Sequence, residues 1–143
     1  MSDNNKPIKR TFFGCSLGET SSKELIKYLT NKKYDFEELC SGDIGIRNSE
    51  CEGFFCEKIK LFIFNDVICD ITVLVGHFED EYLFKTTYDK LYKRFHKNYS
   101  EYFYRETDTG CIYLDDQTLC GFGFEDKKII FFYTDKYLGQ KEQ

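Results

Sequence analysis

Two segments of the chain carry the same pattern of strand, acidic turn and strand. Residues 61–75 read LFIFNDVICDITVLV, and residues 121–135 read GFGFEDKKIIFFYTD. Runs rich in aromatic and β-branched residues on either side of a short polar turn are typical of a β-hairpin. In the first segment, Asn65 and Asp66 are residue types that tolerate the positive φ angles of tight turns. The pair of segments therefore predicts a fold built on antiparallel β-sheet.

The first hairpin is apolar on both of its faces. Side chains alternate along a strand, so Leu61 and Ile63 point to one side while Phe62 and Phe64 point to the other. A strand that is apolar on both sides is typical of the middle of a sheet. We expect this hairpin to be covered on both faces, or to be covered on one face and to bind a partner with the other.

A first helix is predicted after Ser21. Ser21 and Glu24 have the spacing of a capping box, and Asn31 is expected to end the helix. The apolar residues recur at helical spacing and form one face: Leu25, Ile26 and Leu29.

A second helix is predicted from about residue 79 to residue 99. Its apolar residues recur at steps of three and four: Phe84, Tyr88, Leu91, Phe95 and Tyr99. Basic residues occupy much of the remaining surface of residues 85–97, including Lys93, Arg94 and Lys97.

The remaining segments read as strands, which places the chain in the α+β class. Residues 34–48 predict two short strands split by a turn, and the segments after the second helix predict an antiparallel meander. The chain therefore runs helix, strands and hairpin twice. Shifting the sequence by 66 positions places Leu25 on Leu91 and Leu29 on Phe95.

We expect one compact domain over residues 11–138, made of two helix-plus-antiparallel-meander units at about 11–76 and 77–138 that arose by internal duplication. The alternative is that any small α+β protein repeats such patterns. Residues 1–10 and 139–143 are polar and are expected to be flexible.

Composition bounds the class of protein. The chain has 143 residues, of which 18% are aromatic, and a formal net charge of -5, which makes its surface as a whole a poor attractor for phosphate backbones. It shows no secretory signal and no run of about 18–20 apolar residues of the kind that crosses a bilayer. The seven cysteines are an odd number, and we expect reduced, largely structural thiols in a cytoplasmic protein with no membrane partner.

The residues do not assemble into a recognisable reaction centre. His77 and His96 are the two histidines available to activate a nucleophile, and no C-x-x-C pair is present. Gly121 and Gly123 lie in strand-like sequence, where they indicate a bulge or close packing rather than a phosphate loop. We therefore expect a protein that is not an enzyme, with no catalytic residue, no metal site and no cofactor.

The opening phrase FFGCSLGETSSKELIKYL resembles that of a group of uncharacterised small bacterial proteins, which begin with aromatic-x-Gly-x-x-Leu-Gly-x-Thr/Ser followed by an amphipathic helix. In those proteins a helix like YDKLYKRFHKNY and a closing strand like IIFFYTD follow. The order of elements is also similar to the fold of β-lactamase inhibitor proteins and small outer-membrane assembly lipoproteins. That resemblance implies a binding or scaffolding module. It transfers no functional residue.

We therefore expect a non-catalytic protein-binding module with an unknown protein partner, in an inhibitor, immunity-like or adaptor role. Aromatic side chains are frequent interface anchors. The candidate anchors lie on the two hairpins, and strand alternation requires half of them to be core: Phe62, Phe64, Phe122, Phe124, Phe132 and Tyr133.

The alternative is a binder of a small ligand or of single-stranded nucleic acid. It would use a cavity between helix and sheet, or the basic helix 85–97 with Lys93, Arg94 and Lys97 as anion contacts. The sequence disfavours nucleic acid, because the aromatic residues of that helix share its apolar stripe.

Overall fold

The protein combines two helices with one large antiparallel sheet, as the predicted α+β class requires. The computed structural model describes residues 6–138. The helices are α1 (Ser22–Asn31) and α2 (Glu81–Tyr99), and a short 3-10 helix, η1 (Ser100–Tyr102), follows the second. The strands, in chain order, are β1 (Thr11–Phe12), β2 (Cys15–Ser16), β3 (Phe36–Glu38), β4 (Ile44–Cys51), β5 (Phe54–Phe64), β6 (Val67–His77), β7 (Phe103–Glu106), β8 (Cys111–Leu114), β9 (Thr118–Glu125) and β10 (Lys128–Asp135).

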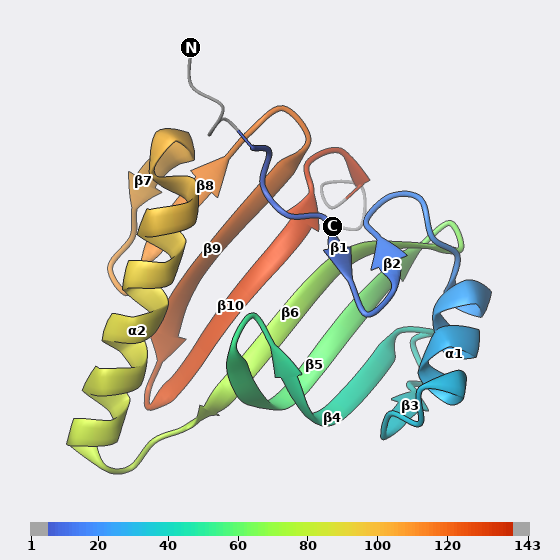
Figure 1. The fold of residues 1–143 in the computed structure, drawn as a ribbon, viewed down its shortest axis with the longest axis horizontal. Coiled ribbons are helices and arrows are strands. Elements are labelled where there is room, and N and C mark those ends of the chain that lie inside the picture. Colours follow the sequence, from blue (N-terminus) through green and yellow to red (C-terminus); the bar gives the residue numbers. More distant parts are fainter. Residues whose placement is uncertain (1–5, 139–143) are drawn as a thin grey trace.

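Eight of the strands form a single sheet in the order β3-β4-β5-β6-β10-β9-β8-β7, while β1 and β2 pair separately (Figure 1). Each helix is followed along the chain by four strands, and the last strands of the two sets, β6 and β10, pair antiparallel in the middle of the sheet. The first predicted hairpin, β5 with β6, therefore contributes a central strand, as its apolar faces indicate. No helix among the described residues is long and apolar enough to cross a membrane.

The capping box predicted for the first helix is present. The Ser21 side chain accepts a hydrogen bond from the Glu24 amide, and the Glu24 carboxylate accepts one from the Ser21 amide. Such a cap contributes about 1 kcal/mol. Leu25 and Leu29 are fully buried, and the helix ends at Asn31 as predicted.

The second helix is positioned by its aromatic stripe. Asp80 caps it by accepting a hydrogen bond from the Leu83 amide. Phe95 lies at the centre of the contact with the sheet. Its ring centroid is 5.2–6.0 Å from those of five other aromatic residues: Tyr99, Tyr113, Phe122, Phe131 and Tyr133. These are distances typical of packed aromatic pairs, so the core is largely aromatic on this side.

The turn between β5 and β6 has the geometry that its residue types predict. Asn65 and Asp66 both adopt positive φ angles, of 50° and 66°. A two-residue turn of this hand matches the twist of the flanking strands. The corresponding turn between β9 and β10 has Asp126 at a φ of 57°.

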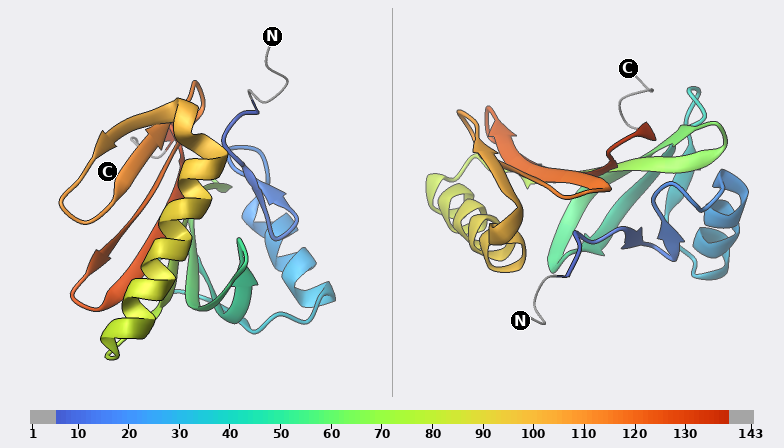
Figure 2. Two further views of the ribbon diagram at one scale, coloured as in Figure 1. Left: turned by 60° about the vertical axis from the view of Figure 1, so that its left-hand side comes forward. Right: turned by 90° about the horizontal axis from the view of Figure 1, so that it is seen from above.

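Both helices and the β1–β2 hairpin lie on the same face of the sheet (Figure 2). The outer end of the β4–β5 hairpin bends over this face as well, with Phe54 buried near the ring of Phe131 (Figure 1). We call this the covered face; one of its rows holds Val73, Phe131 and Phe122. The opposite side, which we call the open face, holds the neighbouring row of Thr72, Phe132 and Gly121.

The N-terminal segment is tied to the far end of the chain. Ile8 is 1% exposed, and its amide donates to Asp115. The Arg10 guanidinium, which pairs with Asp135, is also largely buried. Ile8 and Arg10 are therefore packed against the domain, in contrast to the flexible segment predicted for residues 1–10. The rest of that segment, and the predicted tail 139–143, lie outside the described residues.

Candidate functional site

Strand pairing arranges the side chains of the open face in rows across β6, β10, β9 and β8. The first row holds Leu74, Ile130 and Gly123; the second holds Thr72, Phe132, Gly121 and Ile112; the third holds Asp70, Thr134, Leu119 and Leu114. Successive residues of one strand face opposite sides, so these rows alternate with rows of the buried core.

Six large apolar side chains dominate these rows and form what we call the apolar patch: Leu74, Ile112, Leu114, Leu119, Ile130 and Phe132. All six are only partly buried. In Figure 2 no helix or strand among residues 6–138 lies over this side of the sheet. A contiguous apolar surface on one face of a soluble domain is typical of an interaction site.

The glycines of β9 hold the centre of the patch in place. A Cβ atom on Gly121 would lie 3.1 Å from the Phe132 ring and 2.6 Å from the Cys111 carbonyl oxygen. A Cβ on Gly123 would lie 2.8 Å from the Thr109 hydroxyl oxygen. The prediction that these glycines mark close packing is confirmed, and Phe132 lies over bare backbone that no other residue type would leave open.

A basic corner adjoins the apolar patch on β4 and β5. It consists of Arg47, Lys58 and Lys60. Arg47 pairs across the strands with Lys58, which pairs in turn with Leu74 of the patch. The Lys60 ammonium lies 4.6 Å from the centroid of the Phe62 ring, a cation–π contact.

The cations of the basic corner form few ion pairs with the acidic residues that the structure describes. Arg47 forms an exposed ion pair with Glu37, and none of the other ion pairs between described residues involves the corner. Like charges directly opposite on neighbouring strands, such as Arg47 and Lys58, destabilise a sheet slightly. The corner is thus a local positive surface on a chain with a net charge of -5.

Strand alternation divides the six predicted interface aromatics into two sets of three. Phe122 and Tyr133 are buried in the covered face, and Phe124 packs against Phe84 and Tyr88 of α2. The other three, Phe62, Phe64 and Phe132, are partly buried and do not belong to the core cluster. This matches the expectation that half of the set must be core.

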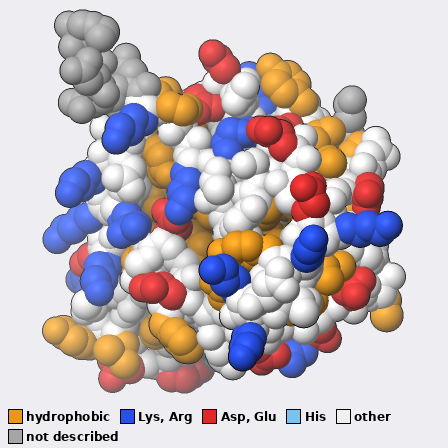
Figure 3. Space-filling model, turned by 45° about the vertical axis from the view of Figure 1, so that its right-hand side comes forward, with side chains coloured by type: hydrophobic (Ala, Val, Ile, Leu, Met, Phe, Trp, Pro, Cys, Tyr) orange, Lys and Arg blue, Asp and Glu red, His pale blue; other side chains and the backbone are white. Residues whose placement is uncertain are grey.

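The cations predicted as anion contacts lie on the outer surface of α2. Lys93, Arg94 and Lys97 are all exposed, and Lys and Arg side chains gather on the side of the molecule where α2 lies (Figure 3). Arg94 reaches the β4–β5 turn, where it would contact a Cβ placed on Gly53. The buried part of the aromatic stripe, including Phe95 and Tyr99, points away from these cations into the core.

Both histidines have identified neighbours. His77 lies 3.2 Å from the carboxylate of Glu79 at the surface. The His96 Nδ1 atom lies 2.5 Å from the hydroxyl oxygen of buried Tyr113, and its ring stacks on Tyr92 with 4.4 Å between centroids. Burial raises the pKa of Tyr113. This arrangement, which joins α2 to β8, could not be foreseen from the sequence because the two residues come from different elements.

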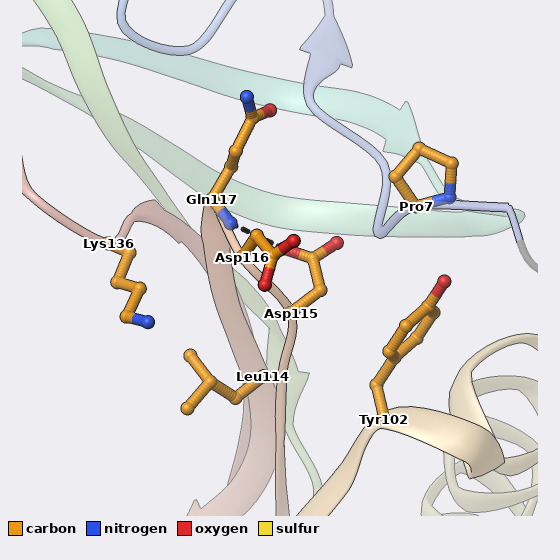
Figure 4. Close-up of a pocket in the computed structure, with 7 residues that line it drawn as sticks. All are labelled: Pro7, Tyr102, Leu114, Asp115, Asp116, Gln117 and Lys136. Atoms are coloured by element: carbon orange, nitrogen blue, oxygen red, sulfur yellow. Dashed lines mark hydrogen bonds between the residues drawn. The ribbon is translucent and has the colours of Figure 1, made fainter.

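A pocket of about 540 Å³ lies beside the β8–β9 connection (Figure 4). Asp115 lines it, yet its carboxylate already accepts three backbone hydrogen bonds, from the amides of Ile8, Gln117 and Thr118. The carboxylate therefore serves the turn and the N-terminal segment. Within residues 6–138 no cluster of His, Cys, Asp and Glu has the geometry to hold a metal ion.

The thiols offer a direct check of the packing. Cys40 is the exposed cysteine, and the other six are buried. Burial raises the pKa of Cys15 to about 11 and that of Cys56 to about 12, and it also raises the pKa values of Cys51, Cys111 and Cys120. Because the thiolate is the reactive form, we expect an alkylating reagent at about pH 8 to modify one of the seven thiols in the folded protein and all of them in denaturant.

Mass spectrometry of the alkylated protein measures this result. A Cys40→Ser variant is the control and should remain unmodified while folded. Rapid modification of a second site in the native protein would contradict the buried positions of the other thiols.

Reasoning from the sequence identified Phe62, Phe64 and Phe132 but missed the aliphatic members of the patch and the basic corner. The available signal was alternation in CIYL and in KIIFFYTD, which places Ile112, Leu114 and Ile130 on the face opposite Tyr113 and Phe131. Which of the two faces carries the helices is a tertiary property.

No protein-family model, no curated protein and no solved structure matches the chain.

Proposed function

We propose that this protein is a non-catalytic protein-binding module that holds its partner on the open face of the sheet. The observation that carries the proposal is the apolar patch, six large side chains on four neighbouring strands with no described element above them. Covering such side chains removes apolar surface from water, which is the main favourable term in most protein association.

The support of the patch also favours this role. Phe132 lies at its centre with its ring against the Gly121 backbone, and it is flanked along β10 by Ile130. A rigid sheet surface pays little ordering entropy on binding, so aromatic and aliphatic anchors held in this way contribute efficiently.

The test compares what the tagged full-length chain and two variants retain from a lysate of its source cells. Leu74→Thr with Ile130→Thr removes apolar surface from the open face while keeping residue types that favour strands. We expect a protein that is retained by the wild type at high salt, after nuclease treatment, to be lost by this variant.

The matched control is Tyr82→Ser with Leu83→Ser. These α2 residues are 75% and 53% exposed, so the control removes a comparable apolar surface away from the sheet. The control variant should retain the same protein, and circular dichroism should show both variants folded. Retention of the protein by the Leu74/Ile130 variant, or its loss on nuclease treatment, would contradict the proposal.

We also propose that the two halves of the domain arose by internal duplication. In support, residues related by a shift of 66 have the same environment. Leu25 and Leu91 are fully buried, and in the second pair Leu29 is 0% exposed and Phe95 is 1% exposed. The turns after residues 64 and 125 both join the third and fourth strands of their sets. The same order of elements supports the resemblance to inhibitor and assembly-lipoprotein folds as a proposal. The cysteines form no disulfide among the described residues, which supports a cytoplasmic location.

A further inference from the structure

The charges around the apolar patch are distributed unevenly. In the strand rows of the open face the cations are Arg47, Lys58, Lys60 and Arg105, and the anions are Glu37 and Asp70. The exposed acids Glu50 and Glu57 lie further out on the β4–β5 hairpin, and Lys128 and Glu125 face each other at the far end of β9 and β10. Three of the cations form the basic corner, directly beside Leu74. The face is therefore positive at the corner next to the patch, although the chain as a whole is negative.

Building on the proposed function, we propose that the partner is an acidic polypeptide that lays its carboxylates on the basic corner and its apolar side chains on the apolar patch. Complementary charge at the edge of an apolar contact steers association and sets the orientation of the partner. The corner lies at one end of the patch, so the partner's acidic residues should lie to one side of its apolar residues.

The chemistry of the patch favours a polypeptide over single-stranded nucleic acid. Five of its six members are leucine or isoleucine, which offer no flat surface for stacking bases. The cations gather at a corner instead of following a track across the sheet, as binding of a phosphate backbone would require.

The experiment selects binders of the immobilised full-length chain from a displayed library of random peptides. We expect the selected peptides to be enriched in Asp and Glu next to Leu, Ile or Phe. A selected peptide is then synthesised with a fluorescent label, and its affinity is measured by anisotropy at two salt concentrations. Binding should weaken as the screening length falls from about 10 Å at 0.1 M salt to about 3 Å at 1 M.

Variants locate the contact. Lys58→Glu with Lys60→Glu should weaken binding by about tenfold or more, because like charges then face each other. The control, Lys90→Glu with Lys93→Glu, makes the same change of charge on exposed positions of α2 and should bind normally. A peptide in which lysines replace the acidic residues should bind the Lys58/Lys60 variant better than it binds the wild type.

The outcomes separate this inference from the proposed function. A different result would be selected peptides that are apolar and lack acidic residues, whose binding is lost in the Leu74→Thr/Ile130→Thr variant but kept in the Lys58→Glu/Lys60→Glu variant. That result would overturn the acidic partner and leave protein binding standing. Selected peptides that no open-face variant affects would overturn both. Binding of a labelled oligothymidylate that the Lys58/Lys60 variant loses, or dimerisation of the chain through this face in sedimentation, would also overturn the inference.

Discussion

Arg10→Met is expected to lower the free energy of unfolding by about 3–5 kcal/mol, because it leaves a largely buried carboxylate without its cation. The guanidinium donates to Asp135 Oδ2 at 2.6 Å and to the Thr118 hydroxyl at 2.7 Å. It also donates to the carbonyl oxygens of Leu17 and Gln117. A single side chain thus joins the N-terminal segment to the residue that follows β2, to β9 and to β10, and methionine keeps much of its volume but none of its donors.

The stability lost in Arg10→Met should depend on pH, because Asp135 is a titratable group. Burial alone would raise the pKa of this carboxyl group, but hydrogen bonds from the Leu138 amide, Arg10 and the Tyr137 amide hold it below the usual 3.8. A depressed pKa adds stability above the unfolded value, and this stability is lost as the pH falls through the folded value. The difference between wild type and variant should therefore be largest near neutral pH and shrink below pH 3.8.

Urea denaturation at neutral and acidic pH measures both effects. Arg47→Met is the matched control, since its ion pair with Glu37 is about half exposed on both sides, and such pairs contribute about 0–1 kcal/mol. Equal losses for the two variants, or a loss at Arg10 that does not change with pH, would contradict the buried ion pair.

Gly110→Ala is expected to destabilise the protein by about 1–3 kcal/mol, because the added methyl group has no space. A Cβ at this position would lie 1.8 Å from the Phe122 carbonyl oxygen and 2.6 Å from its carbon, both backbone atoms of β9. Neither atom can move without separating β8 from β9, where Cys111 pairs with Phe122. Since the Phe122 ring packs on Phe95, the disturbance should reach the core under α2.

Gly45→Ala provides the control within the same sheet. Its Cβ would meet nothing closer than 3.8 Å, and alanine in a strand is favoured over glycine by about 0.5–1 kcal/mol. We expect Gly45→Ala to unfold at the same or slightly higher urea concentration than the wild type. A Gly110→Ala variant that unfolds together with Gly45→Ala would show that the strands are not in contact at this point.

The local elements were readable from the residues because their determinants are close in sequence. The capping box needs Ser21 and Glu24, three residues apart, and the tight turn needs Asn65 and Asp66, which are neighbours. The stripe of α2 repeats every three or four residues, so its buried face follows from helix geometry. These features establish the order of helices and hairpins and therefore the α+β class.

The candidate site was only partly predictable, for a specific reason. Alternation along β10 separates Phe132 from Phe131 and Tyr133, but either set would serve equally well as the buried one. The choice is made by α2, whose Phe95 packs on Phe131 and Tyr133 and leaves Phe132 on the other side. The pairing of Arg47 with Lys58, and of Lys58 with Leu74, likewise depends on the register of strands that the sequence does not state.

By itself, the sequence determined the helices, the hairpins, the antiparallel class and the expectation that half of the hairpin aromatics are core, because each depends on short-range periodicity and turn chemistry. Only the tertiary structure decided that β6 meets β10, that Arg10 reaches Asp135 across 125 residues, and that the apolar patch and the basic corner share the open face of the sheet. These contacts join residues far apart in the chain. Their stability comes from burying one whole face of the sheet, a property of the assembled fold that no single segment carries.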